Sequence, residues 1–350
     1  MALSDKGDVA LVGARINDAG KGAAYVFVRR GGGWMAAQKL QASDGAPGDL
    51  FGGSVALGED GDVALVGADH KDAGRGAAYV FVRGGESWSE QQKLQASHAA
   101  PGDFFGGSVA LSQDGEVALV GALGKEDVRG AAYVFARSAQ AFSEQQKLQA
   151  SDAAIDDSFG GSVALSPDGD VALIGASGKD DSTGAAYVFV RRGESWSEQQ
   201  QLQASDRAPT DFFGNSLALS KHGHVVLVGA FAKDHLTGAA YVFVRHGQSW
   251  SEREKLVASD AAQGDLFATD VALGEHGDVA LVGAVRNEAT GSAYVFLRRG
   301  QSFSEQQKLG ASDAAPGDLF GDSVALSARG DAALVGAQGK DVARGAAYVF

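Results

Sequence analysis

The sequence predicts an all-β protein, a seven-bladed β-propeller, on two observations. The chain of 350 residues has seven tyrosines, each in the phrase Gly-Ala-Ala-Tyr-Val-Phe or a near copy, at positions 25, 79, 133, 187, 241, 294 and 348. The spacing is 54 residues five times and 53 residues once, so one module is copied in tandem. Each module holds four strand-like segments separated by turn residues, which is the pattern of a propeller blade.

The second copy shows how each strand is predicted. Residues 53–57 and 63–68 are small and apolar, and Asp60-Gly61 between them is a two-residue hairpin signal. Residues 77–83 are rich in aromatic and β-branched side chains, which favours a third strand. Residues 88–96 are the most polar, so we expect an outer strand in contact with water. We name these strands A, B, C and D, from the central channel outward.

Seven copies of A, B and C and six of D give 27 predicted strands. We expect one domain, residues 1–350, with blades at approximately 1–50, 51–104, 105–158, 159–212, 213–266, 267–319 and 320–350. The seventh blade stops at Phe350, after strand C, and so lacks its outer strand. An unpaired edge invites self-association, although a fragment of a longer protein is the explanation that we favour.

Composition excludes several classes of function. The formal charge of −14 argues against nucleic acid as a partner, because such binding relies on Lys and Arg. The chain has no cysteine, no apolar run long enough for membrane insertion, and no signal peptide after Met1. Gly-x-Ser-x-Gly, P-loop and His-Glu-x-x-His motifs are absent, so we expect a protein that is not an enzyme.

The repeats resemble FG-GAP repeats, the units of the integrin α-subunit propeller and of many bacterial surface and secreted proteins. The resemblance covers the whole chain and implies an extracellular or cell-surface location and a role in adhesion. The "FG" pair matches Phe51-Gly52, Phe105-Gly106, Phe159-Gly160, Phe213-Gly214 and Phe320-Gly321, with Phe267-Ala268 departing from it. The "GA" pair matches Gly13-Ala14, Gly67-Ala68, Gly121-Ala122, Gly175-Ala176, Gly229-Ala230, Gly283-Ala284 and Gly336-Ala337.

The family's calcium loop, Asp-x-Asp-x-Asp-Gly-x-x-Asp, is not matched here. The A–B connections are short, as in Asp60-Gly61-Asp62, and cannot supply the six to eight oxygens that calcium prefers. We therefore expect no cofactor, with Ca²⁺ as the ion to test.

Strand alternation places the B–C and D–A loops on one face of the disc, and both loops carry candidate ligand-binding carboxylates. The B–C loops hold an acidic residue after Lys or Asn, at Asp18, Asp72, Glu126, Asp180, Asp234, Glu288 and Asp341. The D–A loops hold a second one, at Asp49, Asp103, Asp157, Asp211, Asp265 and Asp318.

The functional hypothesis is an acidic ring around the mouth of the channel. The alternative is that the first residue caps its own turn and the second orders the bend before Phe-Gly. We favour this alternative, because turn chemistry puts the same side chain in every copy. An earlier acidic position, Asp44 in the first copy, becomes His98 in the second. Loops that differ between copies are better ligand candidates, such as Asp69-His70, Leu123, Phe231-Ala232, His235-Leu236 and Val285-Arg286.

The opposite face carries a candidate metal site at His222, His224 and His246, because neutral imidazoles bind zinc or nickel. Exposed turn histidines are more often only solvated.

The leading functional hypothesis is a non-enzymatic binding or structural scaffold that holds a protein or glycan ligand on the B–C and D–A loop face, as in adhesion. A multivalent lectin is the alternative, and a hydrolase that uses channel-mouth carboxylates is the third hypothesis.

Overall fold

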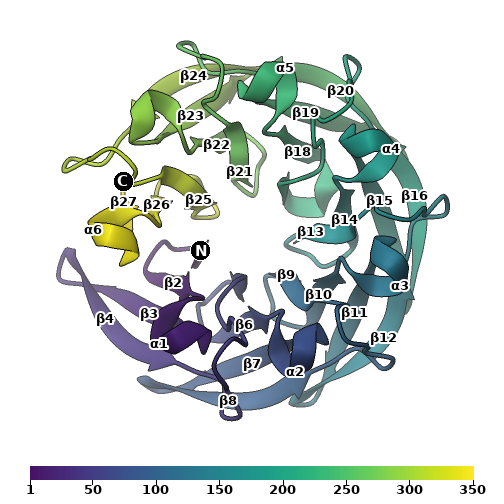
Figure 1. The fold of residues 1–350 in the computed structure, drawn as a ribbon, viewed down its shortest axis with the longest axis vertical. Coiled ribbons are helices and arrows are strands. Elements are labelled where there is room, and N and C mark those ends of the chain that lie inside the picture. Colours follow the sequence, from purple (N-terminus) through teal and green to yellow (C-terminus); the bar gives the residue numbers. More distant parts are fainter.

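Seven antiparallel sheets surround a central channel in the computed structural model, which describes residues 1–350 (Figure 1). Six sheets have four strands and the seventh has three, and within every sheet the strands follow one another in chain order. The predicted seven-bladed propeller is therefore confirmed, as are its 27 strands and the missing outer strand of blade seven. No helix in the structure has the length and apolar character needed to cross a membrane.

The strands of blades one to four are β1 (Ala2–Leu3), β2 (Val9–Ala14), β3 (Ala23–Arg30), β4 (Gly33–Leu40), β5 (Val55–Leu57), β6 (Val63–Ala68), β7 (Ala77–Gly84), β8 (Ser87–Leu94), β9 (Phe105–Leu111), β10 (Val117–Ala122), β11 (Ala131–Ser138), β12 (Ala141–Leu148), β13 (Phe159–Leu165), β14 (Val171–Ala176), β15 (Ala185–Arg192) and β16 (Ser195–Leu202). Blades five to seven contain β17 (Leu217–Leu219), β18 (Val225–Ala230), β19 (Ala239–His246), β20 (Ser249–Leu256), β21 (Phe267–Leu273), β22 (Val279–Ala284), β23 (Ser292–Arg299), β24 (Ser302–Leu309), β25 (Phe320–Leu326), β26 (Ala333–Ala337) and β27 (Ala346–Val349). The short helical turns are α1 (Asn17–Gly20), α2 (Lys71–Gly74), α3 (Lys125–Val128), α4 (Lys179–Ser182), η1 (Lys221–Gly223), α5 (Lys233–Leu236), η2 (Asn287–Ala289) and α6 (Lys340–Ala343).

Two boundaries in blade two differ from the prediction by two residues, and two others differ by one. Strand A begins at Val55 and not at residue 53, because the chain is still turning there: the N–H of Gly53 donates to the carbonyl of Leu50 at 3.2 Å. Strand D ends at Leu94 and not at residue 96, where the D–A loop has begun.

The FG and GA pairs join neighbouring blades. Phe105, at the start of blade three, is fully buried and packs edge-on against Tyr133, with ring centroids 5.6 Å apart. A Cβ on Gly67 of blade two would lie 1.9 Å from the carbonyl oxygen of Gly106. Only glycine permits this approach of two backbones, so the motif sets the distance between blades.

A ring of backbone hydrogen bonds encircles the channel at the A–B end. Each bond joins the second residue after strand A to its counterpart in the next blade, and the N–H of Ala328 donates to the carbonyl of Asp5 at 3.2 Å, which joins blade seven to blade one. The remaining links run Asp5 to Glu59, Glu59 to Gln113, Gln113 to Pro167, Lys221 to Glu275 and Glu275 to Ala328. The ring has one gap, between blades four and five, because Pro167 has no N–H to donate.

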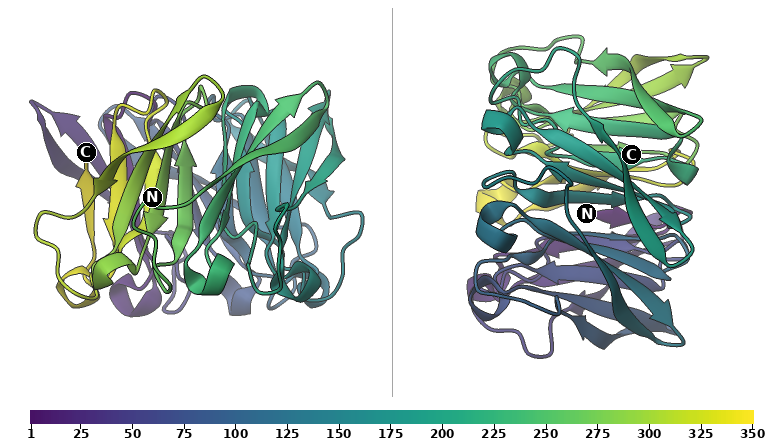
Figure 2. Two further views of the ribbon diagram at one scale, coloured as in Figure 1. Left: turned by 90° about the horizontal axis from the view of Figure 1, so that it is seen from above. Right: turned by 90° about the vertical axis from the view of Figure 1, so that its right-hand side faces the viewer.

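The B–C loops form tight left-handed turns, which gather on one face of the disc (Figure 2). In α2 the φ angles are +52° at Asp72 and +61° at Ala73. Left-handed conformations cost roughly 1–2 kcal/mol per non-glycine residue, so neighbouring contacts must hold each turn in place. The contacts that hold these turns are made by charged side chains of the B–C and D–A loops.

Candidate functional site

The D–A carboxylates are buried partners of lysine. Asp49 Oδ2 accepts the N–H of Ala46 at 2.7 Å and lies 3.0 Å from Nζ of Lys71, the first residue of the next left-handed turn. The side chains of Lys71 and Asp49 are only 6% and 9% exposed. The same pairing recurs as Lys125–Asp103, Lys179–Asp157, Lys233–Asp211 and Lys340–Asp318, and Asn287 replaces lysine against Asp265. These carboxylates order the bend, as expected, and they also anchor the turn beside them.

Lys71 is held as a cation by its surroundings. Burial alone would lower its pKa, but the hydrogen bond and charge of Asp49 outweigh burial and raise it. Lys71 Nζ also donates to the carbonyl oxygen of Asp44 at 2.5 Å. The ammonium therefore bridges the D–A loop and the B–C loop.

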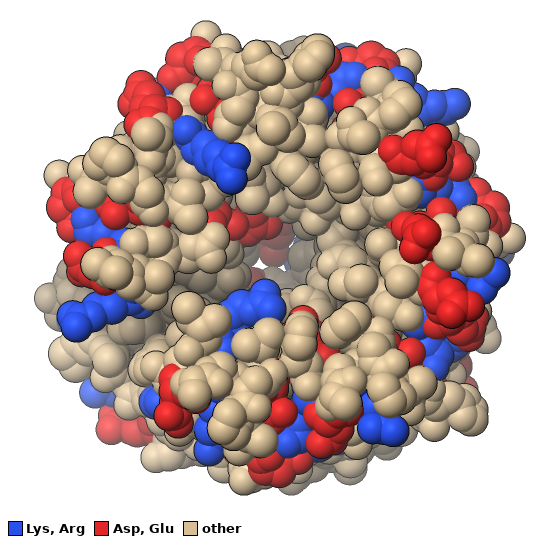
Figure 3. Space-filling model, in the orientation of Figure 1, with Lys and Arg blue, Asp and Glu red and all other residues tan.

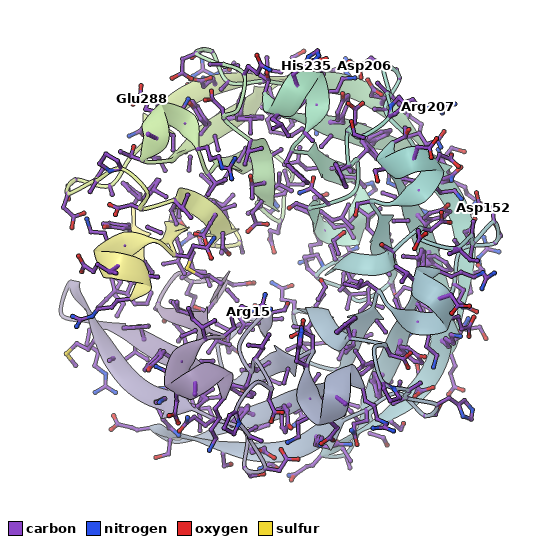
Figure 4. All side chains as sticks on the ribbon, in the orientation of Figure 1. Arg15, Asp152, Asp206, Arg207, His235 and Glu288 are labelled. Carbon is purple, nitrogen blue, oxygen red and sulfur yellow. The ribbon has the colours of Figure 1, made fainter.

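An acidic ring at the channel mouth was the hypothesis that we did not favour, and four of the seven B–C carboxylates make contacts elsewhere. Their side chains reach outward to lysines of the outer strands: Lys255 Nζ lies 3.0 Å from Asp234, and Lys308 Nζ lies 2.9 Å from Glu288. Asp72 and Glu126 pair likewise with Lys93 and Lys147. Figure 4 shows Glu288 at the outer rim. Asp18, Asp180 and Asp341 occupy the same turn without an ion pair. The alternative that we favoured, in which each of these residues caps its own turn, is wrong. The hydrogen bonds that their side chains make go to Lys147, Gln149, Lys255 and Lys308, and none goes to the backbone of the turn.

The earlier acidic position of the D–A loop binds the repeated tyrosine. Tyr79 Oη donates to Asp44 Oδ1 at 2.6 Å, and Lys93 Nζ donates to Asp44 Oδ2 at 2.8 Å. Burial would raise the pKa of Asp44, but these two hydrogen bonds outweigh it and hold the pKa at about 2. His98 stands at this position in the second copy, and the hydroxyl of Tyr133 is buried there without a partner.

The histidines are not gathered into a metal site. His222 Nδ1 contacts Asp168 of the preceding blade, and the rings of His222 and His224 lie 5.9 Å apart, edge to face. No hydrogen bond or ring pairing joins His246 to either of them, and no group of three or more His, Cys, Asp or Glu side chains in the chain is placed to hold a metal ion.

Residues at the A–B end of the channel were missed by sequence reasoning. A cavity of about 270 Å³ is lined there by Asp5, Glu59, Gln113, Lys221 and Glu275. Burial raises the pKa of Asp5, although Gln113 donates a hydrogen bond to it. These residues occupy one position of the repeat, two residues after the end of strand A, and almost every copy has a different residue there. Variation at a single position inside an otherwise repeated module was the signal that could have found them.

A second variable position lies at the other end of the channel, after the GA pair. Its residues are Arg15, Asp69, Leu123, Ser177, Phe231, Val285 and Gln338. Figure 4 shows Arg15 beside the central opening. Phe231 stacks on Phe212 of the adjacent D–A loop, with ring centroids 5.2 Å apart. Four of these seven positions, at Asp69, Leu123, Phe231 and Val285, were predicted as ligand candidates, because they lie in loops that differ between copies.

Two carboxylates in the channel wall also depart from the repeat. Asp270 replaces the serine of the other copies, and Asp322 replaces the glycine of blades two to four. Asp270 Oδ2 accepts the N–H of Val324 at 2.8 Å. Burial raises the pKa of both, to about 6 for Asp322, in spite of the nearby ammonium group of Met1. Asp270 therefore joins blade six to blades five and seven, and the ammonium group of Met1, which donates to Ser323, lies near both carboxylates.

Comparison with known families shows which repeat family the blades of this chain belong to. The family model described as FG-GAP repeat matches residues 34–81, 88–135, 142–189, 196–243, 250–296 and 303–350. The chain belongs to the FG-GAP repeat family. Each FG-GAP match runs from the outer strand of one blade to strand C of the next, so the family unit straddles the blade interface that the FG and GA pairs build.

Solved structures similar to this FG-GAP propeller include proteins with diverse names. Hydrazine synthase of Kuenenia stuttgartiensis has a TM-score of 0.66 at 13% identity, covering 99% of this chain and 94% of that one. A putative 6-phosphogluconolactonase from Bacteroides fragilis has a TM-score of 0.64 at 12% identity, covering 94% and 87%. A periplasmic gluconolactonase from Pseudomonas aeruginosa has a TM-score of 0.58 at 16% identity, covering 97% and 93%. At these identities the likeness concerns the fold alone.

Proposed function

We propose that this FG-GAP propeller is a non-enzymatic binding scaffold that holds a protein ligand on its B–C and D–A loop face, in adhesion outside the cell or at its surface. The proposal rests on a difference between the residues that all copies share and the residues that differ between copies. Most of the carboxylates common to the copies are engaged in contacts within the scaffold, whereas residues that differ between copies surround the channel on this face. A partner that contacts the variable residues would bind them on a scaffold that the shared residues already hold in place.

The chemistry of the loop face suits a protein partner. Acidic and basic side chains lie mainly around its outer rim, and most of the surface nearer the opening is uncharged (Figure 3). The stacked Phe212 and Phe231 supply an apolar spot on blade five, and Leu236 in the turn of the same blade is 42% exposed. Protein interfaces commonly centre on aromatic anchors within a polar rim.

Attachment to a panel of immobilised extracellular proteins would test the proposal. Phe231→Ala together with Arg15→Ala should weaken the binding of any ligand found by at least 10-fold, because about 1.4 kcal/mol of lost contact is a factor of ten. His224→Ala, on the opposite face, is the matched control and should leave binding unchanged. Equal loss in both variants, or binding that follows net charge alone, would contradict the proposal.

A lectin is the second candidate, and one cavity favours it. A space of about 580 Å³ between blades four and five is lined by polar groups that include Gln201, Ser205, Arg207 and Glu252. Arg207 is specific to this loop, since other copies have glycine or alanine at its position. A glycan array with wild type and Arg207→Ala would test this reading, which requires a signal in the wild type that the variant loses.

A further inference from the structure

We propose that blade three carries a binding site for a carboxylate, held by the hydroxyl of Tyr133 and the ammonium group of Lys147. The blade-three site is defined here as these two side chains together with Lys125 and His98. Its ligand is the carboxylate of an aspartate or glutamate side chain in a partner protein, or that of a small free acid, since the same chemical group binds in either case. The proposal is independent of the proposed function, because a small carboxylate tests it without any protein ligand.

Five other copies of the module show how a carboxylate is bound at this position. In each, the repeated tyrosine donates to one oxygen of an aspartate in the D–A loop at 2.6 or 2.7 Å, in the pairs Tyr79–Asp44, Tyr187–Asp152, Tyr241–Asp206, Tyr294–Asp260 and Tyr348–Asp313. In four of them, a side chain of the outer strand donates to the other oxygen, and these donors are Lys93, Gln201, Lys255 and Lys308. One carboxylate therefore accepts from two separate side chains, one at each oxygen.

Blade three keeps these donors but has no carboxylate at this position. His98 stands where the other copies have aspartate. Tyr133 is only 1% exposed, and its hydroxyl is buried without a partner, which is unfavourable because the hydroxyl has lost its bonds to water. Lys147 is the partner of Tyr133 in the register of β11 and β12, and the only carboxylate that it contacts is that of Glu126. An anionic acceptor would complete this arrangement of an unpaired donor beside a cation.

The charges in blade three also leave room for an anion. In blade two, the two lysines of this region make ion pairs with three carboxylates, those of Asp44, Asp49 and Asp72. In blade three, the corresponding lysines pair with only two, those of Asp103 and Glu126. The additional acidic side chain of this turn, Asp127, is 83% exposed and lies near an arginine instead. A bound carboxylate would therefore restore the balance that blade two has.

The position of the missing carboxylate is open to solvent. Where an aspartate holds it in blades two, four, five and six, the side chain is between 40% and 48% exposed. The side chain of His98 is exposed as well and makes no hydrogen bond or ion pair. Lys125 Nζ holds this loop through its backbone, because it donates to the carbonyl oxygen of His98 at 2.5 Å. The imidazole can thus turn aside without losing a hydrogen bond, while the loop around the site stays in place.

The test follows the Tyr133 hydroxyl directly, by NMR of protein labelled with carbon-13 at Cζ of tyrosine. The resonance that is missing from Tyr133→Phe belongs to Tyr133. The probe is sodium acetate, with sodium chloride keeping the ionic strength constant. We expect the Tyr133 resonance to shift and to saturate with a Kd below about 100 mM, because the ligand becomes the acceptor of its hydroxyl. The resonance of Tyr187, whose acceptor is Asp152, should not shift.

Variants of the blade-three site sharpen the test. His98→Asp supplies a carboxylate from the chain itself, so its Tyr133 resonance should lie at the shifted position without acetate and should not respond to it. Lys147→Gln keeps a donor, as Gln201 does in blade four, but removes the charge, and should weaken acetate binding several-fold. The matched control is Lys93→Gln, the same change in blade two, which should leave acetate binding at Tyr133 unchanged.

A peptide distinguishes the two sources of the carboxylate. Acetyl-Gly-Asp-Gly-amide presents the group as a protein does, and acetyl-Gly-Asn-Gly-amide lacks its charge and should not bind. Binding of the aspartate peptide at least as tight as that of acetate would support the site and assign it to an acidic side chain of a partner. Binding of acetate alone would support the site and assign it to a small free acid.

Four results would overturn the proposal. They are no shift of the Tyr133 resonance up to about 100 mM acetate, an equal response in His98→Asp, equal losses in Lys147→Gln and Lys93→Gln, and binding of the asparagine peptide as tight as that of acetate. A Tyr133 resonance that lies at the shifted position without acetate, and leaves it in His98→Ala, would also overturn the proposal, because the imidazole would then be the acceptor.

Discussion

Replacing Lys71 tests whether the repeated carboxylates serve the scaffold. Lys71→Met keeps the length of the aliphatic stem but removes the cation that faces Asp49, leaving a carboxylate with a side chain only 9% exposed and without a counterion. Breaking a buried ion pair by removing one partner costs on the order of 3–5 kcal/mol. We expect a loss of stability of that size, since Lys71 also gives up its hydrogen bond to the Asp44 carbonyl.

Urea denaturation followed by tryptophan fluorescence measures the effect. Lys71→Met with Asp49→Asn should recover part of the loss, because no uncompensated charge remains and the Asn oxygen can still accept the N–H of Ala46. Lys71→Asn with Ala77→Ser copies blade six, where Asn287 bonds to both Asp265 and Ser292, and should be milder than Lys71→Met.

Lys6→Met is the control for an exposed pair, since Lys6 and Asp60 are 68% and 66% exposed, and it should change stability by less than about 0.5 kcal/mol. If Lys71→Met lost no more than this control, the scaffold role of the pair would be refuted.

Three further predictions concern single positions. His98→Asp should stabilise the protein by about 1 kcal/mol, because it gives the buried hydroxyl of Tyr133 an acceptor. Asp152→His should destabilise blade four, because it removes the acceptor of the Tyr187 hydroxyl. Unchanged urea midpoints in both variants would contradict this prediction. The pKa of Asp322 is raised to about 6, so its contribution to the free energy of unfolding is fully present below about pH 4 and is lost as the pH rises through 6. The urea midpoint should therefore fall between pH 4 and pH 8, and Asp322→Asn should remove this fall. An unchanged fall in the variant would assign it to other groups, such as Asp270. Gly67→Ala should prevent blades two and three from packing together stably, because its Cβ would lie 1.9 Å from a backbone oxygen. The Cβ of Gly84→Ala would meet nothing within 4 Å, so this control should melt like the wild type. A folded Gly67→Ala variant as stable as the wild type would refute the packing argument.

The architecture could be predicted because every copy repeats the same local signals. The phrase around each tyrosine, the hairpin glycine and the polar outer strand agree in all copies, so strand number and order followed directly. The left-handed turns could not be predicted, because residues such as Val128 and Val342 disfavour positive φ, and the fold imposes it on them.

The candidate site was predicted only in part, because contacts over long sequence distances decide it. The lysine or asparagine before each B–C acidic residue was noted, but its partner lies 22 residues earlier in the D–A loop, as for Lys71 and Asp49. The outward reach of Asp234 and Glu288 depends on lysines of strand D that the linear pattern does not connect to them. In the sequence, Asp5 and Glu275 are ordinary turn residues that lie far apart. In the structure, the arrangement of the blades around the channel places both in one cavity.

We interpret the repeated carboxylates as groups that hold the blades together and do not bind calcium. Thermal unfolding of the wild type in EDTA and in 5 mM Ca²⁺ tests this interpretation, because an ion that binds only the folded state must raise the midpoint. We expect the same midpoint in both, since the lysine partners already neutralise most of these carboxylates. A rise of several degrees that grows with Ca²⁺ concentration, and that Mg²⁺ does not reproduce, would contradict it.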